Sequence, residues 1–177
     1  MHIRQMTAED RPEIETLLDA AFGPDRHTRT AYRLREGSTP VAELCFVIRH
    51  EDGPNEGHLC ASIEFWPIEV ACRASGRALS ALLLGPVAVA EECRGQGLGG
   101  RLIRLGLETA ERLGYPLVIL VGDPEYYSRF GFSNEATGGW RLPGPVEQRR
   151  LMARVSDPSL ALPLEAEVRK PLRAAAE

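Results

Sequence analysis

The stretch LLLGPVAVAEECRGQGLGGRLI, residues 82–103, is the most informative part of the sequence for the fold. It begins as an apolar strand, passes through glycines at Gly95, Gly97 and Gly99, and ends in a helical pattern of leucine and isoleucine. A second apolar run, LVILV at 117–121, follows that helix. The order strand, glycine loop, helix, strand predicts a βαβ unit, whose two strands lie parallel.

Three apolar segments suggest the rest of the sheet. Predicted strands at 41–50, 59–70 and 81–89 are joined by short turns, which is typical of an antiparallel meander. An earlier strand at 2–6 leads into an amphipathic helix. Antiparallel strands followed by a parallel unit predict a mixed α/β sheet.

The length favours one domain. We expect a single domain over 1–177, with a core of about 1–155 and a C-terminal extension over 156–177. The extension is rich in proline and alanine, and its structure does not follow from its pattern.

The composition excludes several classes of protein. Hydrophobic residues make up 44% and the net charge is −4, without a basic block, which argues against a nucleic-acid partner. The apolar runs are too short to span a membrane, and the N-terminus lacks the apolar core of a signal peptide. We therefore expect a cytoplasmic protein with no membrane partner; a homodimer is compatible with the sequence.

The cysteines and histidines show no motif. Four cysteines lie far apart without a CxxC pair, and the four histidines form no HExxH pattern. We interpret the cysteines as reduced thiols of the core or surface and expect no metal.

The glycine loop satisfies two patterns. Gly95, Gly97 and Gly100 fit GxGxxG, the dinucleotide fingerprint, but AEECR separates them from the strand and four predicted strands come first. A Walker A loop is excluded because no Lys-Ser/Thr follows. The second pattern, Arg/Gln-x-x-Gly-x-Gly/Ala, is matched by Arg94, Gly97 and Gly99. Glycines admit a ligand close to the backbone, and a helix N-terminus offers free N–H groups to a pyrophosphate. These six residues alone would equally fit an ordinary turn.

The surrounding motifs carry a family resemblance. LLLGPVAVAEECRGQGLGGRLI, followed by VGDPEYYSRFGF at 121–132, resembles the GNAT superfamily of acyl-CoA-dependent N-acyltransferases. GDPxYYxRFGF with the later GGWRLPGPV is similar to its YhbS-like bacterial branch. The resemblance implies a mostly antiparallel mixed sheet with a splayed parallel βαβ unit and helices on both faces.

The resemblance also implies a coenzyme site for acetyl-CoA. Gly85 and Pro86 should produce a bulge, because proline cannot donate to a ladder, and so splay this strand from the strand at 117–121. The resemblance then places the pantetheine arm on the exposed backbone and the pyrophosphate on the loop. The expected coenzyme residues are Val87, Ala88, Val89, Arg94, Gly95, Gln96, Gly97, Leu98, Gly99 and Gly100.

The catalytic assignments rest on one tyrosine and one carboxylate. Tyr127 stands four residues before the glycine of the Gly-Phe signature, where the family often places the acid that protonates the leaving thiolate. Tyr126 is the second choice, and ordinary packing is the alternative for both. Glu64 is a weak candidate base, with water as the other acceptor. Trp66 and Trp140 either line the amine pocket or belong to the core.

The sequence thus predicts an N-acetyltransferase that moves the acetyl group of acetyl-CoA to a primary amine by direct attack in a ternary complex. A GNAT-fold sensor that binds acyl-CoA without turnover is one alternative. A dinucleotide-dependent oxidoreductase is the other.

Overall fold

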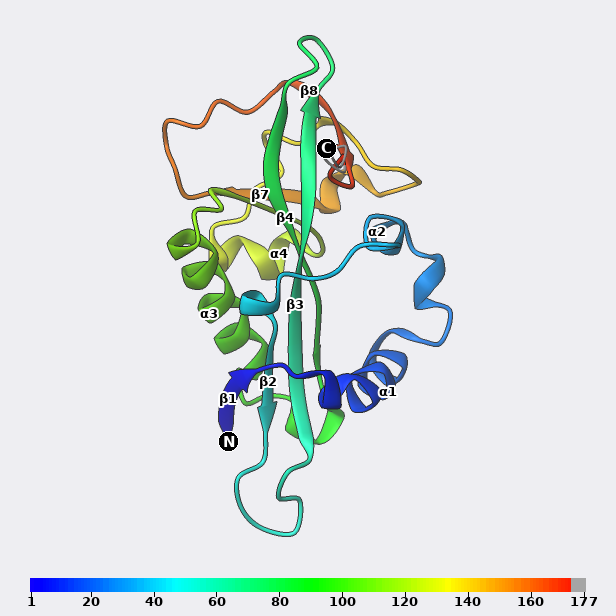
Figure 1. Ribbon diagram of the computed structural model, residues 1–177, viewed down its shortest axis with the longest axis vertical. Coiled ribbons are helices and arrows are strands. Elements are labelled where there is room, and N and C mark those ends of the chain that lie inside the picture. The colour runs from blue at the N-terminus through cyan, green and yellow to red at the C-terminus, as the bar shows by residue number, and fades with distance from the viewer. Residues whose placement is uncertain (173–177) are drawn as a thin grey trace, which may run out of the picture.

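The computed structural model describes residues 1–172 and contains one eight-stranded sheet (Figure 1). The main strand order is β1-β2-β3-β4-β5-β7, and β8 pairs with both β3 and β6. The strands are β1 (His2–Gln5), β2 (Phe46–Arg49), β3 (Leu59–Cys72), β4 (Ala78–Val89), β5 (Leu117–Val121), β6 (Gly139–Arg141), β7 (Leu151–Val155) and β8 (Glu165–Arg169). The α-helices are α1 (Arg11–Phe22), α2 (Thr30–Arg33), α3 (Leu98–Arg112) and α4 (Pro124–Tyr127).

The long β3–β4 hairpin is the centre of the sheet. Its strands are antiparallel, whereas β4 and β5 are parallel, as the βαβ pattern predicted. The β4–β5 ladder consists of only two pairs, Leu82 with Val118 and Leu83 with Ile119. Beyond Leu83 the two strands diverge, so the predicted splay is confirmed.

A bulge in the β3–β4 ladder coincides with the start of this divergence. Ile63 pairs with Val87 and Phe65 pairs with Leu84, so β4 carries one more residue than β3 between these pairs. Gly85, with φ of +119°, lies inside the irregular segment. Because residues with a side chain rarely adopt that φ, glycine at this position permits the bulge.

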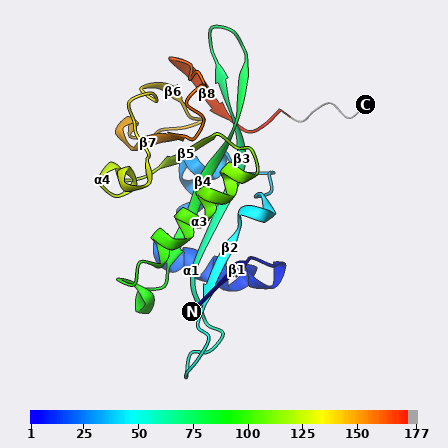
Figure 2. The ribbon, with the colours of Figure 1, turned by 90° about the vertical axis from the view of Figure 1, so that its left-hand side faces the viewer.

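Helices cover both faces of the sheet, as expected for this fold (Figure 2). On one face α3 lies against β3, and a β-carbon at Gly106 would come within 2.3 Å of the Phe65 ring. Glycine therefore allows the close approach of helix and strand. On the other face α1 packs against β3 and β4 (Figure 1). The short helix α2 borders the same cavity as the β4 bulge. These two helices form one wall of the site described below.

The segment expected to be a C-terminal extension contributes a strand to the main sheet. Residues of β8 pair antiparallel with the end of β3, from Glu69 with Arg169 to Cys72 with Ala166. On its other side β8 pairs parallel with β6, where Trp140 is fully buried. The strand therefore completes the upper part of the sheet. Within residues 1–172, no helix is long and apolar enough to cross a membrane.

Candidate active site

The glycine loop leads directly into the first turn of α3. Gly97 is the residue before the helix and has φ of +71°, in the left-handed region that favours glycine. Among the described residues, the backbone N–H groups of Gly95, Gln96 and Gly97 donate no hydrogen bond to another backbone group. All three residues are exposed. Free N–H groups at the N-terminus of a fifteen-residue helix create a positive potential suited to an anion.

The lower half of β4 has a free edge on the side of β5. The N–H of Ala90 donates to the carbonyl of Cys60 on β3. Because successive residues of a strand direct their backbone groups to opposite sides, Ala88 also faces β3, whereas Val87 and Val89 face the gap. The β4–β5 ladder has already ended at Leu83. The backbone of Val87 and Val89 is therefore available to an extended ligand.

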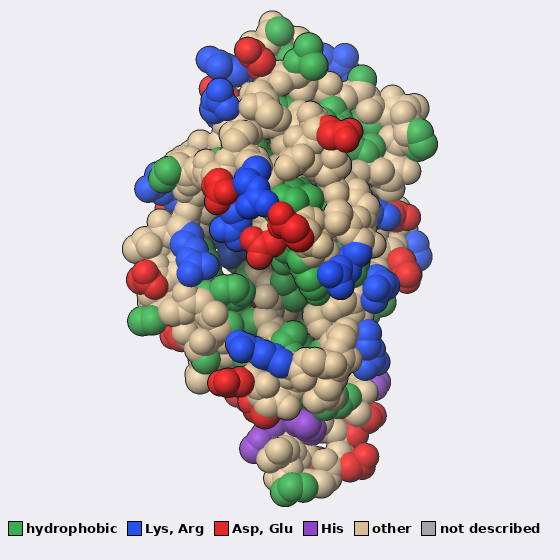
Figure 3. Space-filling model, turned by 180° about the vertical axis from the view of Figure 1, so that it is seen from behind, with side chains coloured by type: hydrophobic (Ala, Val, Ile, Leu, Met, Phe, Trp, Pro, Cys, Tyr) green, Lys and Arg blue, Asp and Glu red, His purple; other side chains and the backbone are tan. Residues whose placement is uncertain are grey.

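A cavity of about 410 Å³ opens at this gap. The bulge of β4 and the end of β5 form one side, and the segment from α1 to α2 forms another. The back view shows an apolar hollow there, bordered by acidic and basic side chains (Figure 3). Lining residues from the sheet side include Gly85, Pro86, Val87, Leu120, Val121 and Tyr127.

The two neighbouring tyrosines of α4 have different surroundings. The Tyr127 ring lies over Gly122, where a β-carbon would come within 2.3 Å of Cε2, and it lines the 410 Å³ cavity. Burial raises the pKa of Tyr127 to about 12, so its hydroxyl carries its proton at neutral pH. Tyr126 is exposed, and its hydroxyl lies 3.7 Å from the position of a β-carbon on Gly99. Tyr127 therefore faces the cavity, and Tyr126 faces the glycine loop.

A second cavity of about 230 Å³ lies on the α1–α2 side of the bulge. It shares Tyr32, Arg35 and Pro86 with the larger cavity. Glu64, which is 2% exposed, and Trp66 line it from β3. The other predicted tryptophan, Trp140, belongs to the core and donates its indole N–H to the Pro163 carbonyl.

Unpaired polar atoms mark the two cavities. Within residues 1–172, four buried side-chain polar atoms lack a hydrogen-bond partner: Arg35 Nε, Glu64 Oε1, Trp66 Nε1 and Arg150 Nε. Of these, Glu64 Oε1 has a charged partner, because it forms an ion pair with Arg11 Nη2 at 2.6 Å. Each of these four residues lines one or both cavities. Buried polar groups are almost always hydrogen-bonded in native proteins, so this concentration indicates a site that takes a polar ligand.

Arg35 and Arg150 were not identified from the sequence. Arg35 follows α2 and its guanidinium lies 4.7 Å from the Tyr32 ring centroid. Burial lowers the pKa of Arg35 to about 10, which leaves it charged at neutral pH. Nothing in its local sequence separates it from the other arginines of the chain. Its position depends on the tertiary structure, which brings Arg35 to the β4 bulge at Gly85 and Pro86.

Comparison with known proteins identifies the family. Residues 2–134 match the family model described as an acetyltransferase (GNAT) domain. The protein is also 33% identical over 161 residues to the uncharacterized N-acetyltransferase YhbS of Escherichia coli (strain K12), covering 90% of each chain. The chain therefore belongs to the GNAT acetyltransferase family.

Further relatives agree with this assignment. The uncharacterized N-acetyltransferase YjhQ of Escherichia coli (strain K12) is 32% identical over 144 residues, which cover 80% of this chain and 73% of YjhQ. Among solved structures, Escherichia coli YhbS in complex with CoA matches with a TM-score of 0.75 and 28% identity, over 96% of this chain and 89% of that one. A GNAT acetyltransferase from Brucella melitensis in complex with acetyl-CoA has a TM-score of 0.63 and 25% identity, over 96% and 95% of the two chains.

Proposed function

We propose that this protein transfers the acetyl group of acetyl-CoA to a primary amine in a ternary complex. The observation that carries the proposal is the free edge of β4, which runs from the cavity at Tyr127 to the unpaired N–H groups before α3. An extended pantetheine arm could pair with Val87 and Val89 while its pyrophosphate occupies the loop 94–100. The relatives solved with CoA and acetyl-CoA support this choice of coenzyme.

The chemistry follows from the groups around the bulge. The amine nitrogen attacks the thioester carbon, a C–N bond forms, and the C–S bond then breaks. The backbone N–H of Val87 would stabilise the oxyanion of the tetrahedral intermediate. The hydroxyl of Tyr127, which is protonated at neutral pH, would donate to the departing thiolate. The proton released by the amine goes to water or to Glu64, which remains the weaker assignment.

We also propose an acceptor class from the 230 Å³ cavity. Arg35 Nε and Trp66 Nε1 are buried donors without a partner, and Glu64 is a buried carboxylate whose charge partner is the more exposed Arg11. An amine with a nearby carboxylate could bind both kinds of group. Its ammonium would bind the Glu64 carboxylate, and its own carboxylate would accept hydrogen bonds from Arg35 and Trp66. Amino acids and small peptides therefore fit better than polyamines.

Coenzyme binding and turnover separate the candidate functions. In a thermal-shift screen, acetyl-CoA and CoA should raise the melting temperature, and NAD or NADP should not. Acetyl-CoA with an accepted amine should then release free thiol. Stabilisation by acetyl-CoA without turnover, across a broad amine panel, would favour the sensor instead. Stabilisation by a dinucleotide alone would favour the oxidoreductase, which the family assignment already makes the weakest candidate.

The acceptor class needs a matched set of amines. We expect an amino acid to be acetylated with a higher kcat/KM than its amide or its decarboxylated amine. Arg35→Met should remove this preference, whereas Arg33→Met, an exposed position in α2, should retain it. Equal rates for the three amines in the wild-type protein would reject the carboxylate assignment and leave acetyl transfer intact.

A further inference from the structure

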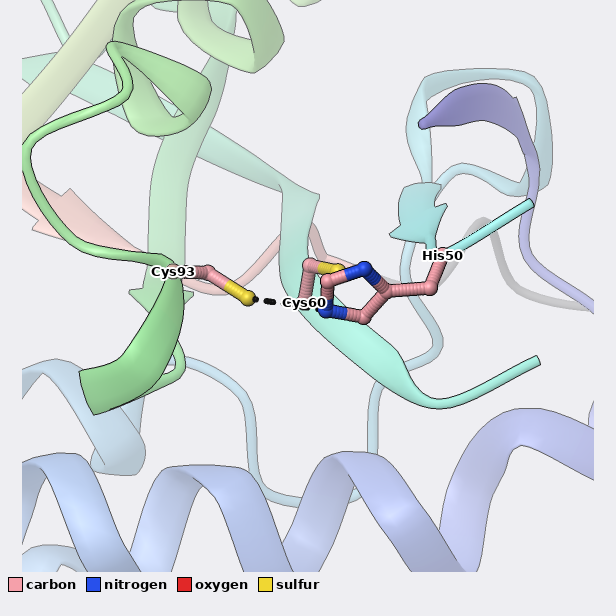
Figure 4. A group of neighbouring side chains, drawn as sticks. All are labelled: His50, Cys60 and Cys93. Atoms are coloured by element: carbon pink, nitrogen blue, oxygen red, sulfur yellow. Dashed lines mark hydrogen bonds between the residues drawn. The ribbon is translucent and has the colours of Figure 1, made fainter. Parts of the chain in front are cut away.

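Three potential metal ligands meet at the end of the molecule opposite β8 (Figures 1 and 4). His50 follows β2, Cys60 is the second residue of β3, and Cys93 ends the short 3₁₀ helix Glu91–Cys93. Their side chains point toward one another from three separate segments (Figure 4). None of them belongs to the cavities that contain Tyr127 and Glu64.

The backbone pairing explains why these residues converge. His50 N donates to the His58 carbonyl, which closes the connection between β2 and β3. Ala90 N donates to the Cys60 carbonyl, and the 3₁₀ helix then turns Cys93 back over the end of β3. His50 and Cys93 are 43 positions apart in the chain. Only the sheet register brings them together, which is why the sequence spacing predicted no metal.

The distances suit a small, thiophilic cation. The ligand atoms of the three residues lie within 4.8 Å of one another, and Cys93 Sγ is 3.4 Å from His50 Nε2. Zinc binds sulfur at about 2.3 Å and imidazole nitrogen at about 2.0 Å in a tetrahedron, which requires ligand separations of roughly 3.5–3.8 Å. Closing the group around zinc therefore needs side-chain movements of about 1 Å or less.

The environment also suits a metal ion. Cys60 is 0% exposed and Cys93 is 1% exposed, so both thiols are protected from solvent. Apart from the contact between Cys93 and His50, the sulfurs have only weak partners, such as the His58 carbonyl at 3.8 Å from Cys60 Sγ. His50 is half-buried, so the group is closer to solvent on the side of the histidine than on the side of the cysteines.

We propose that His50, Cys60 and Cys93 form a three-ligand zinc site. His50 binds through Nε2 and the cysteines bind as thiolates, so two thiol protons leave when the ion enters. The fourth position is open to water or to a small ligand. Cys93 immediately precedes Arg94, so the ion would tie the ends of β2 and β3 to the start of the glycine loop.

The competing use of the two sulfurs is a disulfide between Cys60 and Cys93. A disulfide removes both thiols and would leave His50 with no role in binding. A zinc site needs all three residues together. The three substitutions below therefore distinguish the two chemistries.

Cobalt titration of the reduced, metal-free full chain tests the proposal. Wild-type protein should bind one Co²⁺ with thiolate-to-cobalt charge-transfer absorption and the visible bands of a tetrahedral centre. Added Zn²⁺ should displace the cobalt and so remove both absorptions. Cys60→Ser and Cys93→Ser should lose the charge-transfer absorption, and His50→Gln should weaken binding by at least ~10-fold. The controls are Cys72→Ser, at the other end of β3, and the exposed His58→Gln, and both should titrate like the wild type.

Circular dichroism checks that each variant is folded. Zn²⁺ should raise the melting temperature of the wild type and of the two control variants, and it should not raise that of the three ligand variants. If wild-type protein gives no sulfur charge-transfer absorption, or if His50→Gln binds cobalt as tightly as the wild type, the zinc site is rejected. A Cys60–Cys93 disulfide in protein isolated without reductant, together with no cobalt binding after reduction, would assign the pair to redox chemistry instead.

Discussion

Glu64 Oε1 lies 2.6 Å from Arg11 Nη2, in an ion pair between β3 and α1. The carboxylate is 2% exposed, whereas the arginine is 40% exposed. Glu64 lies between Ile63 and Phe65, where the β3–β4 register shifts. The bulge thus places a buried carboxylate beside the 230 Å³ cavity, and α1 provides its counter-charge from a partly exposed arginine.

This relationship predicts the behaviour of Glu64→Gln. The substitution keeps the shape of the side chain and removes its charge. The free energy of unfolding, measured by urea denaturation, should therefore fall by about 1–3 kcal/mol. If Glu64 helps to accept the amine proton, kcat should also fall and its dependence on pH should change. Glu69→Gln is the control, because Glu69 lies on the same strand and pairs with Arg169 at 3.2 Å. Equal kcat for the two variants would leave water as the proton acceptor.

The glycine loop predicts a loss of coenzyme affinity in Gly97→Val. A valine at φ of +71° strains the backbone and places a side chain where the pyrophosphate should approach. Acetyl-CoA affinity should fall at least ~10-fold, or about 1.4 kcal/mol, by calorimetry. Gly76→Val is a close control, because Gly76 has the same φ of +71° and equally open surroundings in the β3–β4 turn. Equal affinities in the two folded variants would remove the loop from the site.

Tyr127→Phe tests the general acid. It keeps the ring and deletes the hydroxyl, so kcat should fall by roughly 10²–10⁴-fold when chemistry limits turnover, with little change in acetyl-CoA affinity. Tyr126→Phe is the control, and any effect there should fall on the KM for acetyl-CoA, because its hydroxyl faces the loop. A normal kcat in Tyr127→Phe would exclude this residue as the acid. A low kcat in Tyr126→Phe alone would move the role to the other ring.

Gly122 should fix the position of Tyr127. In Gly122→Ala the new β-carbon would lie 2.3 Å from Cε2 and 2.7 Å from Cδ2 of the ring, so the tyrosine must move. We expect kcat to fall at least ~10-fold while the affinity for acetyl-CoA stays near that of the wild type. Gly138→Ala, where a β-carbon meets nothing within 4 Å, is the control. Full activity in Gly122→Ala would show that catalysis tolerates a displaced Tyr127.

Protonation of Asp10 should account for much of the folding stability that the protein loses at acid pH. Its carboxylate, in a residue that is 1% exposed, accepts hydrogen bonds from Arg4 at 2.7 Å and Arg49 at 2.6 Å. The hydrogen bond from Arg4 is the main reason that its pKa is held well below the usual range. A depressed pKa contributes stability that is present above the unfolded value of about 4 and is lost as the pH falls below it.

Asp10→Asn should therefore lower the free energy of unfolding by about 2–3 kcal/mol near neutral pH. The deficit should shrink as the pH falls from about 4 toward 2, because Asp10 of the unfolded wild-type chain takes up a proton there, which favours the unfolded state. Urea denaturation at several pH values measures both effects. Asp52→Asn, in the exposed β2–β3 connection, should follow the wild type throughout. A deficit that stays constant with pH would assign Asp10 a role independent of its charge.

The sequence alone predicted the βαβ unit, its glycine loop and a splay at Gly85 and Pro86, and the β4–β5 ladder indeed ends at Leu83. Each of these depends on neighbouring residues: a strand interrupted by Gly85 and Pro86, a glycine at positive φ before a helix, and a buried strand after it. Neighbouring residues determine such local backbone features, so a short stretch of sequence is enough to predict them.

Only the tertiary structure decided which distant side chains meet. Burial of Glu64 beside Arg11 depends on how α1 packs against β3, and the group of His50, Cys60 and Cys93 depends on the register of three segments. The pairing of β8 with β3 and β6 likewise had no counterpart in the local pattern. Contacts between residues far apart in the chain follow from packing and sheet register, which local spacing does not encode.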